Sequence, residues 1–168
     1  MFTPPPTLST PQQPNQKPMP KERFKLTPAS YLVLIKDGKI LLSKRFNTGY
    51  EDGNYSLVAG HLDGQETFRQ AMTREALEEA GIIINPEDLR VVHVMHRQST
   101  FHDASLRERV DVFTTTEKWN GEPKIMEPHK CDDMNWFSFD ELPKNIIPYV
   151  KQALEHIRDG VFYSEHGF

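Results

Sequence analysis

The chain has 168 residues, of which 37% are hydrophobic, a net charge of −4 and one cysteine, Cys131. This length and apolar content predict one soluble domain, and no apolar run is long enough to span a membrane. The negative charge argues against a protein that holds polymeric nucleic acid on a basic surface. A single cysteine excludes an internal disulfide and a cysteine-rich zinc site, and residues 1–25 carry no apolar signal core, so we expect a cytoplasmic protein.

Residues 1–25 form a proline-rich segment that is predicted to be a disordered or extended tail. Its prolines are Pro4, Pro5, Pro6, Pro11, Pro14, Pro18 and Pro20. Proline cannot donate a backbone hydrogen bond to a helix or a sheet, and the segment has few apolar residues to bury. A proline-rich peptide could dock into a partner's groove, but a solvated tail is the simpler interpretation. We expect the folded domain to span residues 26–168.

The first two strands are predicted at residues 31–35 and 39–43, two apolar runs joined by Lys36-Asp37-Gly38. An Asp-Gly pair between such runs is a β-hairpin signal. The second run continues into Lys44 and Arg45, which places two cations at the end of a strand. Residues 46–54 are a polar loop, and residues 55–59 are predicted to form a strand that leads into Gly60.

Residues 68–80 are predicted to form a helix, because good helix formers fill them. Thr67 or Glu66 can cap its first turn, and Gly81 suits the left-handed position that ends a helix. One helical face carries apolar residues in the first half and three carboxylates in the second. These carboxylates belong to Glu75, Glu78 and Glu79.

Three carboxylates about 6 Å apart repel one another and destabilise a helix unless a cation lies between them. Carboxylate oxygens that leave positions for water and phosphate are the ligands that Mg²⁺ prefers. A solvated acidic face is the common alternative for a glutamate cluster taken alone. No calcium-binding loop of the Asp-x-Asp-x-Asp-Gly type is present.

The second half of the chain is predicted to contain strands at residues 89–96 and 109–116, with a polar loop at 98–106 between them. His93 and His96 point to opposite faces of the first of these strands, so they cannot chelate one ion together. A turn of helix is expected at residues 139–143, and an amphipathic helix, interrupted early by Pro148, at 145–158. Residues 162–168 are expected to pack on the domain.

Residues 60–82 resemble the signature of the Nudix hydrolase family, Gly-x5-Glu-x7-Arg-Glu-U-x-Glu-Glu-x-Gly-U, in which U is a bulky apolar residue. The matching residues are Gly60, Glu66, Arg74, Glu75, Glu78, Glu79, Gly81 and Ile82. Ala76 departs from the pattern because it is smaller than the usual apolar residue. The resemblance implies an α/β class domain, the Nudix α/β/α sandwich with a mixed β-sheet.

The resemblance also implies roles for individual residues. The carboxylates of Glu75, Glu78 and Glu79 and the carbonyl of Gly60 hold one to three Mg²⁺ or Mn²⁺ ions, with either Glu75 or Glu78 as the general base. The run Glu127-Pro128-His129-Lys130-Cys131 is similar to one found in nucleoside-triphosphate-cleaving members, which makes Glu127 a further metal ligand candidate, with an ordinary loop glutamate as the alternative.

Four more positions take supporting roles through the same resemblance. Arg45 is a candidate for binding substrate phosphate, with a plain surface charge as the alternative. Asn145 is a candidate for pairing with a base edge, with helix capping as the alternative. Glu66 and Arg74 are expected to support the acidic cluster, as residues behind metal ligands do.

The expected reaction is the hydrolysis of a phosphoanhydride in a nucleoside di- or triphosphate, which yields a nucleoside monophosphate and pyrophosphate or phosphate. The alternatives are another nucleoside diphosphate derivative, such as ADP-ribose, a dinucleoside polyphosphate or a nucleotide sugar, and a non-catalytic binding module of the same fold. The expected partner is a small-molecule nucleotide, without polymeric nucleic acid or membrane. The oligomeric state is open, with a homodimer as one form.

Overall fold

The computed structural model describes residues 23–100 and 106–168. The strands are β1 (Thr27–Lys36), β2 (Lys39–Arg45), β3 (Tyr55–Ser56), β4 (Val58–His61), β5 (Arg90–Thr100), β6 (Leu106–Thr116), β7 (Cys131–Ser138) and β8 (Tyr163–His166). The α-helices are α1 (Phe68–Ala80) and α2 (Pro148–Arg158), and short 3-10 helices lie at Pro86–Asp88 and Phe139–Glu141. No helix in the described part of the chain is long and apolar enough to cross a membrane.

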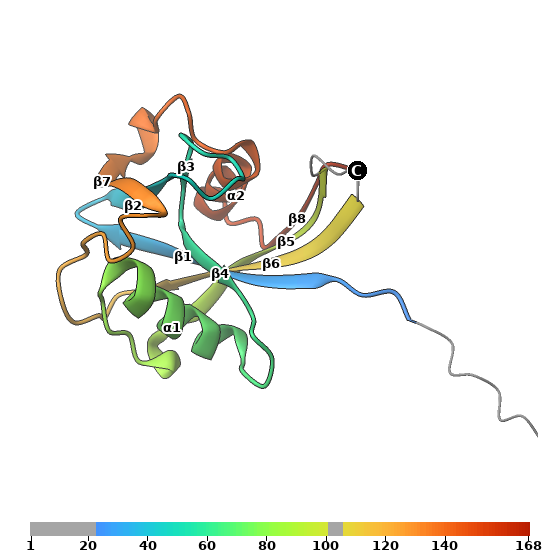
Figure 1. Ribbon diagram of the computed structural model, residues 1–168, viewed down its shortest axis with the longest axis horizontal. Coiled ribbons are helices and arrows are strands. Elements are labelled where there is room, and N and C mark those ends of the chain that lie inside the picture. Colours follow the sequence, from blue (N-terminus) through green and yellow to red (C-terminus); the bar gives the residue numbers. More distant parts are fainter. Residues whose placement is uncertain (1–22, 101–105) are drawn as a thin grey trace, which may run out of the picture.

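The strands form one mixed sheet in which β1 occupies the centre. Along the sheet the order is β3-β2-β1-β6-β5-β8, while β4 also pairs with β1 and β7 also pairs with β2. The pairs β1–β6 and β5–β8 are parallel, and the other strand pairs are antiparallel. Helices α1 and α2 lie on opposite sides of these strands (Figure 1). The predicted α/β/α sandwich with a mixed sheet is therefore confirmed.

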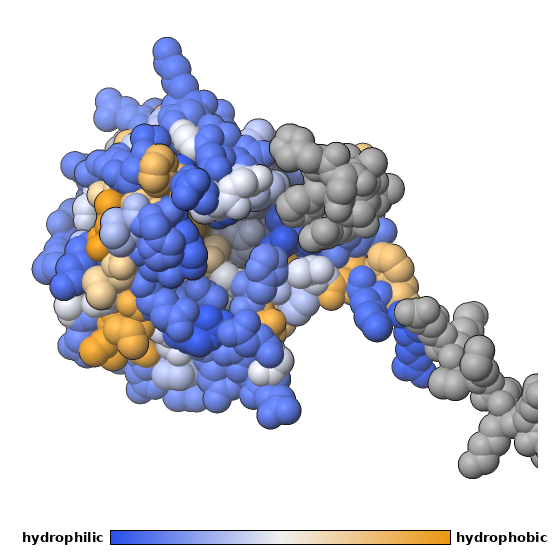
Figure 2. Space-filling model, viewed as in Figure 1, coloured by the Kyte–Doolittle hydropathy of each residue, from blue (hydrophilic) through white to orange (hydrophobic). Residues whose placement is uncertain are grey.

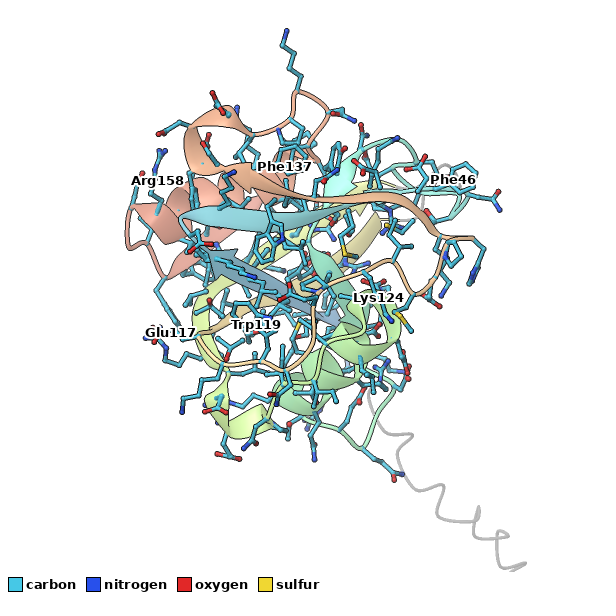
Figure 3. All side chains as sticks on the ribbon, turned by 90° about the vertical axis from the view of Figure 1, so that its left-hand side faces the viewer. Phe46, Glu117, Trp119, Lys124, Phe137 and Arg158 are labelled. Atoms are coloured by element: carbon cyan, nitrogen blue, oxygen red, sulfur yellow. The ribbon has the colours of Figure 1, made fainter. Side chains whose placement is uncertain are left out.

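Each side of the sheet has its own hydrophobic core, because neighbouring residues of a strand point to opposite faces. Tyr31 and Val33 of β1 pack in the core that includes α2, whereas Leu32 and Leu34 pack in the core that includes α1. Phe137 packs against the first core and Trp119 against the second, on opposite sides of the sheet (Figure 3). Burial on both faces explains why β1 reads as a continuous apolar run.

Helix α1 begins and ends where the sequence predicts. The Thr67 side chain accepts a hydrogen bond from the Gln70 amide, and the Gln70 side chain accepts one from the Thr67 amide, which forms a capping box. Gly81 ends the helix in the left-handed conformation with φ of 66°. Ala76, the small residue of the signature, is fully buried against the sheet.

The β1–β2 hairpin is also confirmed. Asp37 and Gly38 both have positive φ, 52° and 73°, as the two central residues of a type I′ turn require. Ile35 pairs with Ile40 and Lys36 with Lys39.

Three sequence predictions about elements were wrong. The strand expected at residues 55–59 is split at Leu57 into β3 and β4, which pair with different strands. The loop expected at 98–106 is shorter, because β5 and β6 extend to Thr100 and from Leu106. The last helix begins at Pro148 and is not interrupted by it, since proline suits the first helical position. The expectation that residues 162–168 pack on the domain is confirmed, since the chain end forms the strand β8 beside β5. The predicted tail falls mainly on residues 1–22, outside the described residues, so it and the 26–168 boundary stay predictions.

Candidate active site

A cavity of ≈ 350 Å³ lies between α1, β4, β2 and the ends of β5 and β6. This volume is in the range of small-molecule sites. Figure 2 shows a recess near the middle of a mostly hydrophilic face. One wall of the cavity carries the carboxylates of Asp63, Glu75, Glu79 and Glu127, and the remaining lining includes the cations Lys44, Arg45, Arg97, Arg109 and Lys130. The cavity therefore holds charges of both signs, and two of them are paired, because Lys130 Nζ donates to the Glu127 carboxylate at 2.8 and 3.0 Å.

Gly60 is a glycine because the side chain of Glu75 lies directly above its α-carbon. A Cβ atom built on Gly60 would lie 1.9 Å from Glu75 Oε1, far inside van der Waals contact. Gly60 lies on β4 opposite Ser30 of β1, so the strand pairing prevents it from moving away. The sequence thus brings the backbone of β4 and the carboxylate of α1 together, as the signature implies.

Glu79 lies against the same strand. Its Oε2 atom accepts a hydrogen bond of 3.2 Å from the amide of Ala59, the neighbour of Gly60. Burial raises the pKa of Glu79 to about 7, and the negative charges of Glu75 and Glu127 contribute to the increase, against the Ala59 hydrogen bond and the charge of Arg45. Burial also raises the pKa of Glu75, although the hydrogen bond from Arg74 opposes it. For both carboxylates, burial outweighs the neighbouring groups that favour the charged form.

Arg74 connects the acidic residues at the outer end of the cavity. Its Nη1 atom donates to Glu75 at 2.7 Å and to Glu78 at 3.2 Å, and its Nη2 atom donates to Glu66 at 2.9 Å and to the His61 carbonyl at 3.1 Å. Glu66 in turn accepts from the amide of Asp63 at 2.8 Å. Arg74 therefore supplies positive charge to Glu66, Glu75 and Glu78 in addition to any bound metal ion.

Replacing Arg74 with lysine is expected to lower catalytic efficiency by about 10- to 100-fold, the range found for residues that orient metal ligands. Lysine keeps the charge but lacks the planar fork that holds three carboxylates and a carbonyl at once. Steady-state kinetics and a thermal melt measure the effect. The exposed Arg69→Lys change on the same helix is the control, and equal kinetics for both variants would contradict the orienting role.

Three of the acidic residues expected to hold a divalent cation line the cavity, and one does not. Among residues 23–100 and 106–168, no three His, Cys, Asp or Glu side chains converge into a ready-made metal site. Glu78 does not line the cavity: its side chain is 53% exposed and is held by Arg74. Glu75, Glu79 and Glu127 do line it. Their oxygen atoms, with the raised pKa of Glu75 and Glu79, fit a hard divalent cation.

Arg45 and Asn145 have different positions relative to the cavity. Arg45 lines it, and its guanidinium donates to the Tyr50 carbonyl at 2.7 Å and to Thr48 Oγ1 at 3.0 Å. Asn145 is exposed, is not among the lining residues, and donates to the Gly53 carbonyl at 2.6 Å. Asn145 also does not cap α2, whose N-cap is residue 147. A contact between Asn145 and a base stays a prediction that this geometry does not favour.

Two cavity residues, Arg97 and Arg109, were not found by sequence reasoning. Arg109 and Asp111 are two residues apart on β6 and therefore lie on the same face of the sheet. Arg97 lies in the part of β5 that extends beyond the predicted end of the strand. A charged residue at an inward position of a strand was the available signal, but the strand at 89–96 ended before Arg97.

Comparison with known proteins gives the class and the family. The NUDIX domain family matches residues 25–158. The fold, the glycine on β4 beneath Glu75 and the acidic face of α1 agree with that match. The chain therefore belongs to the Nudix hydrolase family, and the prediction of an enzyme of this family is confirmed.

Individual relatives are distant. The chain is 27% identical over 125 residues to the NAD-capped RNA hydrolase NudC of Escherichia coli (strain SMS-3-5 / SECEC), a match that covers 73% of this chain and 44% of that protein. The chain thus spans less than half the length of the curated relatives it matches. A MutT NUDIX hydrolase from Burkholderia pseudomallei has a TM-score of 0.69 and 27% identity, covering 79% of this chain and 98% of that one. The mutator MutT protein of Bacillus halodurans, at 16% identity and a TM-score of 0.66 over 84% of this chain and 90% of that one, shows the fold alone.

Proposed function

We propose that this protein hydrolyses a phosphoanhydride bond in a nucleoside di- or triphosphate, releasing a nucleoside monophosphate and pyrophosphate or phosphate. The observation that carries the proposal is that the carboxylates of Glu75, Glu79 and Glu127 line one cavity that also contains cationic side chains, among them Lys130, which pairs with Glu127 at 2.8 Å. A bound Mg²⁺ or Mn²⁺ ion would neutralise phosphate oxygens and lower the pKa of a water molecule. Glu75, Glu79, Glu127 and the Gly60 carbonyl would hold this ion, with Glu78 as a further ligand if it leaves Arg74.

The residues of the chain support a proton transfer as well. During hydrolysis the oxygen of water bonds to phosphorus, the proton of that water passes to a carboxylate, and the bridging oxygen leaves with the bonding electron pair. Glu75 is the stronger candidate for this base than Glu78, because it lines the cavity and its pKa is raised. Lys44, Arg45 and Lys130 line the cavity and can bind the leaving phosphate.

A second candidate substrate is a nucleoside diphosphate joined to another group. The cationic residues Arg97 and Arg109 favour it, since they extend the charged lining beyond the acidic wall. The Escherichia coli relatives are NAD-capped RNA hydrolases. We keep the small-molecule proposal because the net charge of −4 disfavours a polymer of phosphates. Location in the cytoplasm stays a prediction.

The test is a panel of nucleoside triphosphates, nucleoside diphosphates, ADP-ribose, dinucleoside polyphosphates and nucleotide sugars, assayed with Mg²⁺ and with EDTA. We expect release of a nucleoside monophosphate from at least one compound with Mg²⁺ only. The Glu155→Gln variant, on the exposed face of α2, is the matched control for the acidic variants discussed below. Tight binding of a compound without any product would instead support a binding module.

A further inference from the structure

The lining of the cavity includes two arginines that face each other across paired strands. Arg97 of β5 and Arg109 of β6 are direct partners in the β5–β6 register. Like charges directly opposite one another on a sheet are destabilising. Both side chains are nonetheless buried, with Arg97 only 2% exposed, and both line the cavity.

Both arginines pair with the same carboxylate. Asp111, which is fully buried, accepts from Arg97 Nε at 2.7 Å through Oδ2 and faces Arg109 Nε at 3.4 Å through Oδ1. Among the described residues no other carboxylate pairs with either guanidinium. Two positive charges and one negative charge leave this cluster with a net charge of +1. A buried charge without a partner is costly, so this cluster can gain from a second anion.

Two tyrosines, Tyr31 and Tyr149, surround the arginine pair. Their rings are covered by neighbouring side chains, and their hydroxyl groups can donate hydrogen bonds. The guanidinium of Arg97 lies 3.8 Å from the ring centre of Tyr149, and the ring of Tyr31 stacks on Phe113 at 4.8 Å. Tyr31 and Tyr149 are 4% and 6% exposed. Little ring surface is left here for stacking on a nucleobase. Burial raises the pKa of both tyrosines, which keeps their hydroxyl groups protonated and able to donate.

The terminal nitrogens of Arg109 have no hydrogen-bond acceptor among the described residues, while both oxygens of Asp111 are engaged at the Nε side. A guanidinium presents its terminal N–H groups in a fixed fork that matches the two oxygens of a carboxylate or phosphate. The geometry on this side of the cavity therefore suits an oxyanion.

We propose that Arg97 and Arg109 form a subsite for a second oxyanion of the substrate, a phosphate or a carboxylate at the end remote from the hydrolysed anhydride. The favoured substrates are then nucleoside diphosphate derivatives that carry an acidic group on their second half. This assignment of substrate class rests on the proposed function, whereas the binding of the oxyanion does not.

Two matched pairs of compounds test the subsite. UDP-glucuronate and UDP-glucose differ in one carboxylate, and NADP⁺ and NAD⁺ differ in one phosphate. Affinities are measured calorimetrically in EDTA, so that no bond is cleaved, and kcat/KM is then measured with Mg²⁺. We expect the charged member of at least one pair to bind about tenfold more tightly, the effect of one charge-assisted hydrogen bond in a buried site. The pair that shows the preference identifies the oxyanion.

Variants assign the preference to the two arginines. Arg109→Gln is expected to remove most of the tenfold preference, and Arg97→Lys, which keeps the charge but not the fork, is expected to reduce it. Circular dichroism establishes that each variant is folded, and either one suffices if the other fails to fold. Arg90→Gln is the control, because Arg90 lies on the same strand but its side chain is 68% exposed and pairs with Glu117.

The outcomes separate this inference from the proposed function. The subsite is rejected if affinity is equal within both pairs or if neither charged compound binds. It is also rejected if the preference survives in the arginine variants, or if the preference follows the base, such as GTP over ATP. Hydrolysis with Mg²⁺ but no preference leaves the proposed function standing and rejects the subsite. Arginine-dependent binding of a charged compound without hydrolysis supports the subsite and rejects the proposed function.

Discussion

The Glu79→Gln variant is expected to be more stable than the wild type without metal and to lose at least about 100-fold in catalytic efficiency. Burial raises the pKa of Glu79 from its usual 4.5 to about 7. At pH 8 the metal-free protein must therefore keep a carboxylate ionised where its environment favours the neutral form. Glutamine has the same shape, can still accept from the Ala59 amide and carries no charge. The expected gain in unfolding free energy is on the order of 3 kcal/mol.

The stability difference between Glu79→Gln and the wild type is expected to depend on pH. Since the folded protein holds the Glu79 proton more tightly than the unfolded chain, stability from this group is fully present below about pH 4.5 and is lost as pH rises towards 7. The gain from Glu79→Gln should therefore be large at pH 8 and small at pH 5. Thermal melts in EDTA at both values measure it.

Mg²⁺ should reverse the ranking at pH 8 by stabilising the wild type more than the variant, because a ligand that binds only the folded state raises its stability. Glu155→Gln is the control, since the Glu155 side chain lies on α2, outside the cavity, and is 48% exposed. A Glu79→Gln protein that is less stable than the wild type in EDTA at pH 8, or fully active, would contradict this description of the site.

The Gly60→Ala variant is expected to lose about 100-fold in catalytic efficiency, because its methyl group needs the space of the Glu75 carboxylate. A displacement of about 1 Å at a catalytic group is enough for such a loss. The stability cost should stay within about 1–3 kcal/mol, the range for overpacking, since a side chain and not the backbone has to move. Steady-state kinetics and denaturant unfolding measure the two effects separately.

A double-mutant cycle tests the cause of this loss. In a Glu75→Ala background the obstructing carboxylate is absent, so adding Gly60→Ala should cost little further stability. The coupling between the two changes should then account for most of the Gly60→Ala effect. Additive costs would show that Gly60 is required for another reason.

The local parts of this protein could be predicted from sequence because neighbouring residues determine them. The capping box at Thr67 and Gln70, the left-handed Gly81 and the Asp37-Gly38 turn each depend on backbone geometry within a few residues. The fixed spacing of the signature likewise identified the helix whose carboxylates border the cavity. Its metal ligands stay predictions, whereas Arg74, which was expected to support the acidic cluster, donates to both Glu75 and Glu78.

Strand pairing lay beyond the sequence because it joins segments far apart in the chain. Alternation along β5 and β6 predicts which residues share a face, but not which strand lies beside them. The split at Leu57 arises because β3 and β4 pair with different strands.

By itself the sequence determined helix α1 with its three glutamates, the β1–β2 hairpin and the Nudix family, since each is encoded in contiguous residues. Only the tertiary structure decided that Arg97 and Arg109 meet over one carboxylate in the cavity of Glu75 and Glu79. That meeting depends on the register between β5 and β6, in which a shift of one residue would turn one arginine to the other face of the sheet.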